Sequence, residues 1–146
     1  MRLSISTPLA VAVDAPEVRS VRAEDESGSF GILPGHADFL TALTVSVISW
    51  RDPRMKLHHA AVNGGSLSVT GGTMVRVATP EAVVGTDLGQ LEADVLARFR
   101  RQVEQERESR AEAHRMSVAA IRAIVRLLRP QLLRPGSQLD MTGSSA

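Results

Sequence analysis

The sequence has no cysteine, no tyrosine, one tryptophan and three phenylalanines among its 146 residues. The absence of cysteine excludes disulfide bonds, thiol catalysis and thiolate-bound metals, and it is compatible with a reducing compartment. With so few aromatic rings, a hydrophobic core must be built mainly from Val, Leu, Ile and Ala. The hydrophobic share of 43% is enough for one small folded domain with an appendage, and it argues against a wholly disordered chain.

Long apolar segments are missing as well. No run of residues approaches the ~20 consecutive apolar side chains of a membrane-spanning helix, and the first residues carry no segment of signal-peptide type. We therefore expect a soluble or peripheral protein that does not span a membrane itself. Any relation to a membrane should pass through a partner or a surface contact.

Charge is nearly balanced, at a net +1, but it is unevenly placed. Residues 1–87 carry a net charge of −2, and residues 88–146 carry a net charge of +3. Proteins that bind nucleic acid usually have a much more basic domain, so this mild asymmetry does not favour nucleic acid as a partner.

Residues 1–86 have the pattern of an antiparallel β-sandwich domain. Short segments rich in Val, Leu and Ala, such as 9–13 and 74–78, alternate with turn residues at close intervals. Two glycine pairs, Gly64-Gly65 and Gly71-Gly72, suit tight hairpin turns because glycine accepts positive φ without a Cβ clash. Many short strands with no helix between them predict a sandwich or a barrel.

The pattern changes near residue 87, and a helical arm is predicted over 87–130. Gly and Pro are absent between Gln90 and Arg129, and apolar residues recur at three- and four-residue steps. Asp87 is followed three residues later by Gln90, as in a capping box, which predicts the start of the helix. The first apolar stripe is Leu88, Leu91, Val95, Phe99 and Val103, and the second is Ala113, Met116, Ala120, Ile124, Leu127 and Leu128.

Two arrangements of this arm compete. One is a single helix of about forty residues, and the other is an antiparallel helical hairpin that turns in the polar stretch around 106–110. Each stripe is narrow, and pairing the two would bury both, which favours the hairpin. The lack of Gly or Pro leaves the extended form open. Pro130 should end the arm, and residues 131–146 should form a disordered tail.

Residues that could carry chemistry are few. Neither glycine pair leads into a helix or precedes a lysine, so a phosphate-binding loop and nucleotide hydrolysis by this chain are not expected. His58 and His59 are neighbours on a predicted strand and should point to opposite faces, where they cannot easily hold one metal ion together. We expect no catalytic residue, no metal and no cofactor.

Two alternative functions remain open on these residues. His36 and Asp38 could form an acid–base couple, which with a further histidine would make a small metal-dependent hydrolase. Without a companion nucleophile, we favour a structural or interface role for His36. The other alternative is a stand-alone sandwich adaptor whose Arg-rich arm binds nucleic acid or acidic surfaces. The arm's arginines alternate with glutamates, however, as on a solvated helix face.

Residues 28–43 carry the most specific motif of the chain. Gly-Ile-Leu-Pro-Gly-His at 31–36 is followed by a small residue and by Leu-Thr-Ala-Leu at 40–43. This segment resembles the epsilon subunit of F-type ATP synthases. Asn63-Gly64-Gly65, with the strand that follows, is similar to a second signature of that family, and the resemblance covers residues 1–130.

The resemblance implies a ten-stranded N-terminal β-sandwich and an antiparallel pair of helices at the C-terminus. It also implies a non-catalytic subunit of the central stalk, placed between the gamma subunit and the ring of c subunits and able to reach the alpha and beta subunits through its helical arm. Such a subunit is peripheral on the cytoplasmic face of the bacterial inner membrane and couples rotation to ATP-linked transport of protons or sodium ions. By resemblance, the c-ring interface comprises Ser29, Phe30, Gly31, Ile32, Leu33, Pro34, Gly35 and His36, and the gamma interface comprises Asn63, Gly64 and Gly65.

Two positions depart from the family pattern. Members commonly have proline two residues after the motif histidine, whereas this chain has Asp38 followed by Phe39. This variant looks closer to the epsilon subunits of the alternate N-type ATPases, which are thought to pump sodium ions or protons by ATP hydrolysis. Some members bind ATP through an Asp-x-x-Arg-Ala motif on the arm. Asp94 and Arg98 have a different spacing, which argues against ATP binding but leaves the question open on the sequence.

Overall fold

A computed structural model describes the backbone of residues 1–133 and the side chains of residues 1–128. These residues fall into two units, Met1–Val103 and the segment from Glu104 onward, and each is described by itself. Of the tail predicted to be disordered, residues 134–146 lie outside the described residues.

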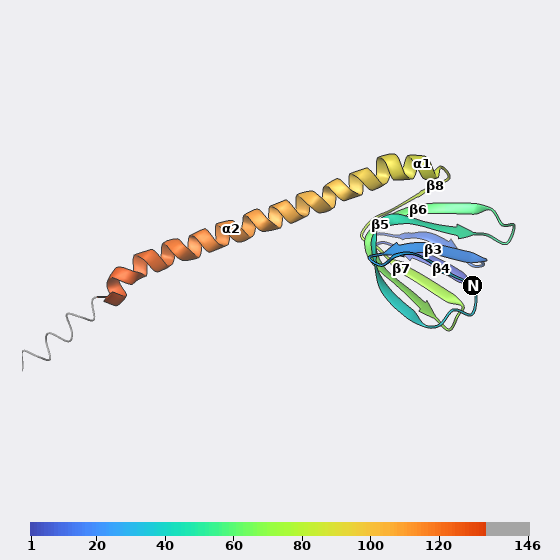
Figure 1. The fold of residues 1–146 in the computed structure, drawn as a ribbon, viewed down its shortest axis with the longest axis horizontal. Coiled ribbons are helices and arrows are strands. Elements are labelled where there is room, and N and C mark those ends of the chain that lie inside the picture. Colours follow the sequence, from blue (N-terminus) through green and yellow to red (C-terminus); the bar gives the residue numbers. More distant parts are fainter. Residues whose placement is uncertain (134–146) are drawn as a thin grey trace, which may run out of the picture. The chain divides into compact units, whose positions relative to one another are not determined.

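Eight strands form the β-structure of the first unit (Figure 1). Their bounds are β1 Arg2–Ser6, β2 Val11–Ala15, β3 Ser20–Asp25, β4 Gly28–Ile32, β5 Phe39–Arg51, β6 Leu57–Thr70, β7 Met74–Ala78 and β8 Ala82–Gly85. Neighbouring strands follow the order β2-β1-β7-β6-β5-β3-β4, and β8 pairs with β6 beside this path. The β1–β7 pair is parallel and the other pairs are antiparallel.

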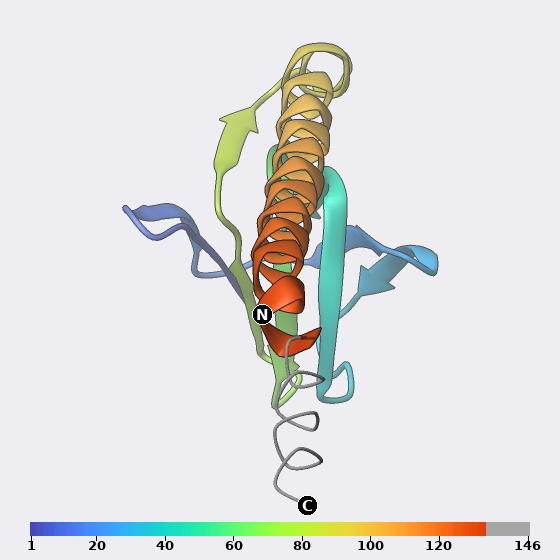
Figure 2. The ribbon, with the colours of Figure 1, turned by 90° about the vertical axis from the view of Figure 1, so that its left-hand side faces the viewer.

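Strands β5 and β6, of 13 and 14 residues, are the longest strands of the sandwich. They pair with each other along most of their length. One end of β6 pairs with β7 and the other end pairs with β8, so the same strand contributes to both layers. Figure 2 shows the β1–β2 and β3–β4 hairpins on opposite sides of this long pair.

The expected sandwich is confirmed, but the expected number of strands is wrong. The resemblance implied ten strands, and the described part of the chain contains eight. The physical reason lies in β5 and β6, because a long strand that bends from one layer into the other takes the place of two short ones.

The main core lies between the two layers and consists largely of Val, Leu, Ile and Ala, as the low aromatic content predicts. Strand alternation produces it: Leu3 and Ile5 of β1 and Val75 and Val77 of β7 point inward, while their neighbours are more exposed. Trp50 adds one buried aromatic side chain, 6% exposed.

Three consecutive helical segments follow β8: α1 Leu88–Gln90, the π-helix η1 Leu91–Leu96, and α2 Ala97–Leu133. The predicted cap is confirmed, because an Asp87 carboxylate oxygen accepts a hydrogen bond from the Gln90 amide at 3.3 Å. This bond satisfies one of the free amide groups of the first helical turn.

A second, smaller core joins the start of the helical segment to the sheet. Leu91, Leu96 and Phe99 pack with Ala61 of β6, and Phe99 is 0% exposed. In a π-helix the hydrogen bonds span five residues, which brings Leu91 and Leu96 to the same face. The first turns of the helical segment therefore belong to the sandwich unit.

The predicted helical hairpin is wrong, because α2 runs without a break through the polar stretch at 106–110. Neither Gly nor Pro interrupts this stretch, and its Glu, Gln and Arg side chains have high helix propensity. Glu106 and Arg110 also form an i,i+4 contact at 3.9 Å, which favours a continuous helix.

Helix α2 also extends past Pro130, its predicted end, to Leu133. Leu133 is also the last residue whose backbone the structure describes. Apolar residues of the second stripe remain exposed, with Met116 at 66% and Leu127 at 75%. None of the helices in the described range is long and apolar enough to cross a membrane.

Candidate functional site

The loop between β4 and β5, residues 33–38, carries the central part of the most specific sequence motif and is called the Pro34 loop below. It begins with a turn in which the His36 amide donates to the Leu33 carbonyl at 3.1 Å. Gly35 adopts a φ of +85°, a conformation that L side chains rarely adopt. Pro34, directly before this glycine, fixes one further backbone angle of the turn.

The Pro34 loop is fastened to the β6–β7 turn, which is far away in sequence. The Gly35 amide donates to the Gly72 carbonyl at 2.9 Å, and the Gly71 amide donates to an Asp38 carboxylate oxygen at 2.8 Å. A Cβ atom on Gly72 would lie 2.8 Å from the Gly35 Cα, so a side chain there does not fit. Asp38, the residue that departs from the family pattern, thus joins the two turns.

Aromatic rings support the same loop from its base. The rings of Phe30 and Phe39 meet edge to face at 5.6 Å, and the rings of His36 and Phe39 do so at 5.9 Å. Leu33, the first residue of the loop, is 63% exposed, and Leu40 at the start of β5 is 74% exposed. The result is a rigid loop with apolar side chains facing solvent, which is suited to docking on another surface.

The residues predicted for the c-ring interface occupy two structural elements. Ser29 to Ile32 belong to β4, and Leu33 to His36 belong to the Pro34 loop. The Ile32 side chain is 0% exposed, so its contribution to any contact is to hold the loop's base. The exposed Leu40 was not among the predicted residues, although its place after the motif made it visible in the sequence.

The residues predicted for the gamma interface lie inside β6, where the strand bends. Gly64 and Gly65 have φ values of +71° and +105°, and a Cβ atom on Gly65 would lie 2.0 Å from the Ala78 carbonyl oxygen. The prediction of a hairpin turn at this glycine pair is therefore wrong, because the glycines allow a bend within one strand. At the other pair, Gly71-Gly72, the turn is confirmed.

Asn63 stands next to this bend with an unsatisfied group. The backbone amide of Asn63 donates to the Glu81 carbonyl at 3.0 Å. The side-chain Oδ1 atom of Asn63 is buried without a hydrogen-bond partner. A buried polar atom of this kind is costly, and a partner that supplied a donor would remove the cost.

His36 and Asp38 do not form the acid–base couple that the sequence allowed. The Nδ1 atom of His36 lies 2.7 Å from the Ala37 carbonyl oxygen, and the Asp38 carboxylate accepts from the Gly71 amide. No group of three potential metal ligands exists among the residues with described side chains. The arrangement thus gives no support to the hydrolase alternative.

His58 and His59 point to opposite faces of β6, as predicted. His58 stacks on Trp50 at 5.6 Å and contacts the Asp52 carboxylate at 3.0 Å through Nε2. His59 contacts the Ser49 hydroxyl at 2.7 Å through Nδ1. The pKa of Asp52 is lowered, first by the hydrogen bond from His58 and then by the backbone amides of Lys56 and Arg54.

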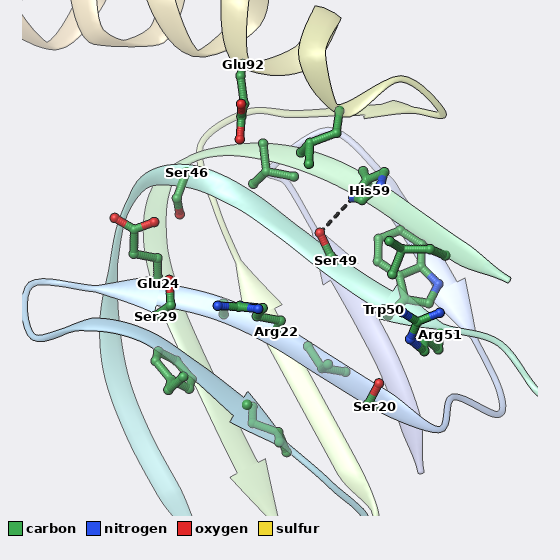
Figure 3. A pocket seen from close by; sticks show the side chains of 18 of the residues that line it. Ser20, Arg22, Glu24, Ser29, Ser46, Ser49, Trp50, Arg51, His59 and Glu92 are labelled. Atoms are coloured by element: carbon green, nitrogen blue, oxygen red, sulfur yellow. Dashed lines mark hydrogen bonds between the residues drawn. The ribbon is translucent and has the colours of Figure 1, made fainter. Parts of the chain in front are cut away.

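A depression of about 880 Å³ lies on the outer face of β3, β4 and β5, beside the first helical turns (Figure 3). Ser20, Arg22 and Glu24 of β3 line it, together with Ser49 and Arg51 of β5. Sequence reasoning missed this feature. The alternation of polar residues along β3 was a signal for one solvent-facing side, but the pairing with β5 could not be read from the sequence.

Comparison with known proteins gives the same fold. Residues 1–85 match the family described as "ATP synthase, Delta/Epsilon chain, beta-sandwich domain". The chain is 43% identical to ATP synthase epsilon chain 2 of Paraburkholderia xenovorans, over 89% of this chain and 94% of that protein. It is 41% identical to ATP synthase epsilon chain 2 of Cereibacter sphaeroides, over 88% of each chain.

Solved structures agree on the fold at low sequence identity. A chain of the Euglena gracilis mitochondrial ATP synthase, from the assembly "OSCP/F1/c-ring", superposes with a TM-score of 0.55 at 20% identity, covering 73% of this chain and 62% of that one. A chain of the Tetrahymena thermophila mitochondrial ATP synthase, from the "central stalk/cring", gives a TM-score of 0.52 at 15% identity, covering 64% and 71%.

Proposed function

This chain belongs to the delta/epsilon chain family of ATP synthases, and we propose that it clamps the gamma subunit of a rotary ATPase to the ring of c subunits. It is a non-catalytic subunit of such an enzyme, like the epsilon chains that it matches over nearly their whole length. In this role the sandwich transmits torque between its partners, and no residue takes part in bond making or breaking.

The geometry of the Pro34 loop carries the c-ring half of the proposal. The loop is fixed to the β6–β7 turn through Gly35, Asp38 and Gly71, and it presents Leu33 to solvent. A preorganised loop loses little conformational entropy on docking, so the exposed apolar side chains can contribute most of their burial energy to the contact. Residues 29–36, with Leu40 beside them, form the proposed c-ring surface.

The bend of β6 supports the gamma half. Gly65 leaves no room for a side chain, and Asn63 keeps a buried oxygen without a partner. A donor from gamma at this bend would satisfy the Asn63 oxygen. The matched chains belong to assemblies that contain the c-ring, and one of these assemblies is the central stalk with the c-ring, which supports a place beside the c-ring.

The helical arm supplies a third contact in this proposal. Apolar side chains of α2, among them Met116, Ile124 and Leu127, are more than half exposed. We infer that they contact the alpha and beta subunits and can regulate ATP hydrolysis there. The subunit is then peripheral on the cytoplasmic face of the bacterial inner membrane.

The names of the relatives support a place in a second, N-type ATPase that transports protons or sodium ions. The relatives from Paraburkholderia xenovorans and Cereibacter sphaeroides, at 43% and 41% identity, are each named epsilon chain 2. Asp38, the departure from the usual proline, has a defined contact with Gly71 in this fold. The chain's partner should therefore be the gamma subunit encoded with it, and not the one of a first ATP synthase in the same cell.

Affinity purification of the tagged full chain from its native membrane tests the proposal. We expect alpha, beta, gamma and c subunits to be recovered together, and their absence would contradict the coupling role. Asp38→Ala, which frees the Pro34 loop, should lower the recovery of c subunits severalfold. Asp14→Ala, which removes an exposed ion pair with Arg2 at the opposite edge of the sheet, is the control and should leave recovery unchanged.

A further inference from the structure

The outer face of β3 and β5 carries two serines and two arginines at four adjoining positions. In the pairing of these strands, Ser20 lies opposite Arg51, and Arg22 lies opposite Ser49. Opposite side chains are about 5 Å apart at Cβ and diagonal ones about 7–8 Å, so these four residues are neighbours on one face of the sheet. All four residues line the depression, and Figure 3 shows Arg51 and Ser20 together at one end of it.

The neighbouring strand fixes one of these hydroxyl groups. Ser49 Oγ lies 2.7 Å from His59 Nδ1, and His59 is only 6% exposed. Because the histidine is held in the sheet, the Ser49 hydroxyl has a defined position at the wall of the depression.

Two positive charges stand at diagonal positions of this surface without a negative partner. The ion pairs of the described residues involve neither Arg22 nor Arg51, although like charges at close positions repel. Arg51 is held in place by a hydrogen bond from Nη1 to the Met55 carbonyl at 3.0 Å. Glu24 lies at the far end of the depression, beyond Arg22 (Figure 3). Glu92 lines the depression from the side of the helical segment (Figure 3).

Apolar side chains continue the depression on the side away from Glu24. Leu57 pairs with Arg51 across β5 and β6, and it is 42% exposed. Leu88, at the start of the helical segment, also lines the depression and is 38% exposed. A ligand that fits this surface has an anionic end for the arginines and an apolar body for the leucines.

We propose that this depression binds a phosphomonoester. Its phosphate group is held by Arg22 and Arg51 with the hydroxyls of Ser20 and Ser49, and its organic group lies on Leu57 and Leu88. Phosphate suits the site better than carboxylate, because its three oxygens and its charge of up to −2 match several donors and two guanidinium groups. The site is separate from the Pro34 loop and from the bend at Gly64-Gly65.

Binding can be measured on the purified full chain with phenyl phosphate as the probe and inorganic phosphate in parallel, at constant ionic strength. Trp50, the chain's one tryptophan, lines the depression beside Arg51, so its fluorescence reports on the site. Amide NMR shifts of Ser20, Arg22 and Ser49 give an independent readout. We expect saturable binding, about tenfold tighter for phenyl phosphate because its ring covers the leucines.

Substitutions decide between a specific site and general charge attraction. Arg22→Gln and Arg51→Gln should each weaken binding of phenyl phosphate about tenfold or more, since each removes charge-assisted hydrogen bonds. Arg76→Gln is the matched control, because Arg76 is an exposed strand arginine on β7, outside the depression. It should bind like the unchanged chain.

Three results would overturn the proposal. They are the lack of a saturable response to phenyl phosphate, equal losses in the Arg76→Gln control and the two site variants, or equal affinity for phenyl phosphate and inorganic phosphate. None of these measurements requires partner subunits, so they are independent of the coupling role.

Discussion

In the sandwich unit Phe99 is 0% exposed, whereas in the segment from Glu104 onward Ile124 is 55% exposed, although both belong to the same helix α2. The first residue is held by contacts with β6 and η1, and the second by the hydrogen bonds of its own helix. The comparison shows that one continuous helix can combine a part stabilised by tertiary packing with a part stabilised by local interactions.

The division between the two units falls within α2, between Val103 and Glu104. The helical residues before it are fastened to the sandwich twice. Phe99 fills the small second core, and the Arg98 guanidinium contacts the Glu81 carboxylate at 2.8 Å. The first helical turns are therefore part of the sandwich unit, which ends at Val103.

The largest effect that tests this comparison is expected from Phe99→Ala. Removing a fully buried aromatic side chain leaves a cavity and should lower the free energy of unfolding of the sandwich unit by about 3–5 kcal/mol. Chemical denaturation followed by Trp50 fluorescence measures it. Ile124→Ala in the same helix is the control and should change this value by less than about 0.5 kcal/mol. Similar small effects for both would show that the helix start is not part of the sandwich.

A proline in the middle of α2 tests whether the helix beyond Val103 can be destabilised without destabilising the sandwich. Ser109→Pro removes a backbone hydrogen bond and should cost the helix about 3 kcal/mol locally. Helicity by far-ultraviolet circular dichroism should fall, while the unfolding midpoint of the sandwich should stay constant. Ser109→Ala should change neither. A lower midpoint in the proline variant would mean that the segment beyond Val103 stabilises the sandwich after all.

The sequence predicted features that depend on local pattern. Alternation gave the sandwich and the opposite faces of His58 and His59, and the spacing of Asp87 and Gln90 gave the helix start. These features arise within a few residues of one another, so no knowledge of distant contacts was needed.

Features set by distant partners escaped prediction. The contact of Asp38 with Gly71 spans 33 residues, and nothing near Asp38 in the sequence announces it. The bend at Gly64-Gly65 has the composition of a turn, and only the long pairing of β5 with β6 makes it part of a strand. Helix α2 is continuous where a hairpin was predicted, because its uninterrupted helix propensity outweighs the burial that pairing the two apolar stripes would give.

Gly72→Ala tests the contact between two turns inside the sandwich unit. The new Cβ would lie 2.8 Å from the Gly35 Cα, at a φ of +69°, so we expect a loss of about 2 kcal/mol in unfolding free energy. Amide exchange at Gly35 should also become faster. Gly31→Ala is the control, because its Cβ would meet no atom within 4 Å. Equal losses in both variants would show that the Pro34 loop is not fixed by Gly72.

Charged side chains also have more and shorter contacts in the sandwich unit than in the exposed part of α2. In the sandwich unit, the Asp52 carboxylate accepts hydrogen bonds from His58 at 3.0 Å and from the Arg54 and Lys56 amides at 2.9 Å. In α2, Glu106 and Arg110 share a contact at 3.9 Å on an exposed helix face. The Asp52 carboxylate is thus held by three short hydrogen bonds, whereas the exposed Glu106 has one long contact.

The smallest effect we expect is the pH dependence contributed by Asp52. Its pKa in the folded chain lies below the ordinary value of 3.8, first because of the His58 hydrogen bond, so the folded state binds this proton more weakly than the unfolded state. The resulting stabilisation is fully present above pH 3.8 and is lost as pH falls through the lowered pKa. Asp52→Asn cannot ionise, so the stability difference between the unchanged chain and this variant should shrink on acidification. His58→Ala should return the pKa of Asp52 toward its ordinary value in an NMR titration, and an unchanged pKa would show that the backbone amides alone hold the carboxylate.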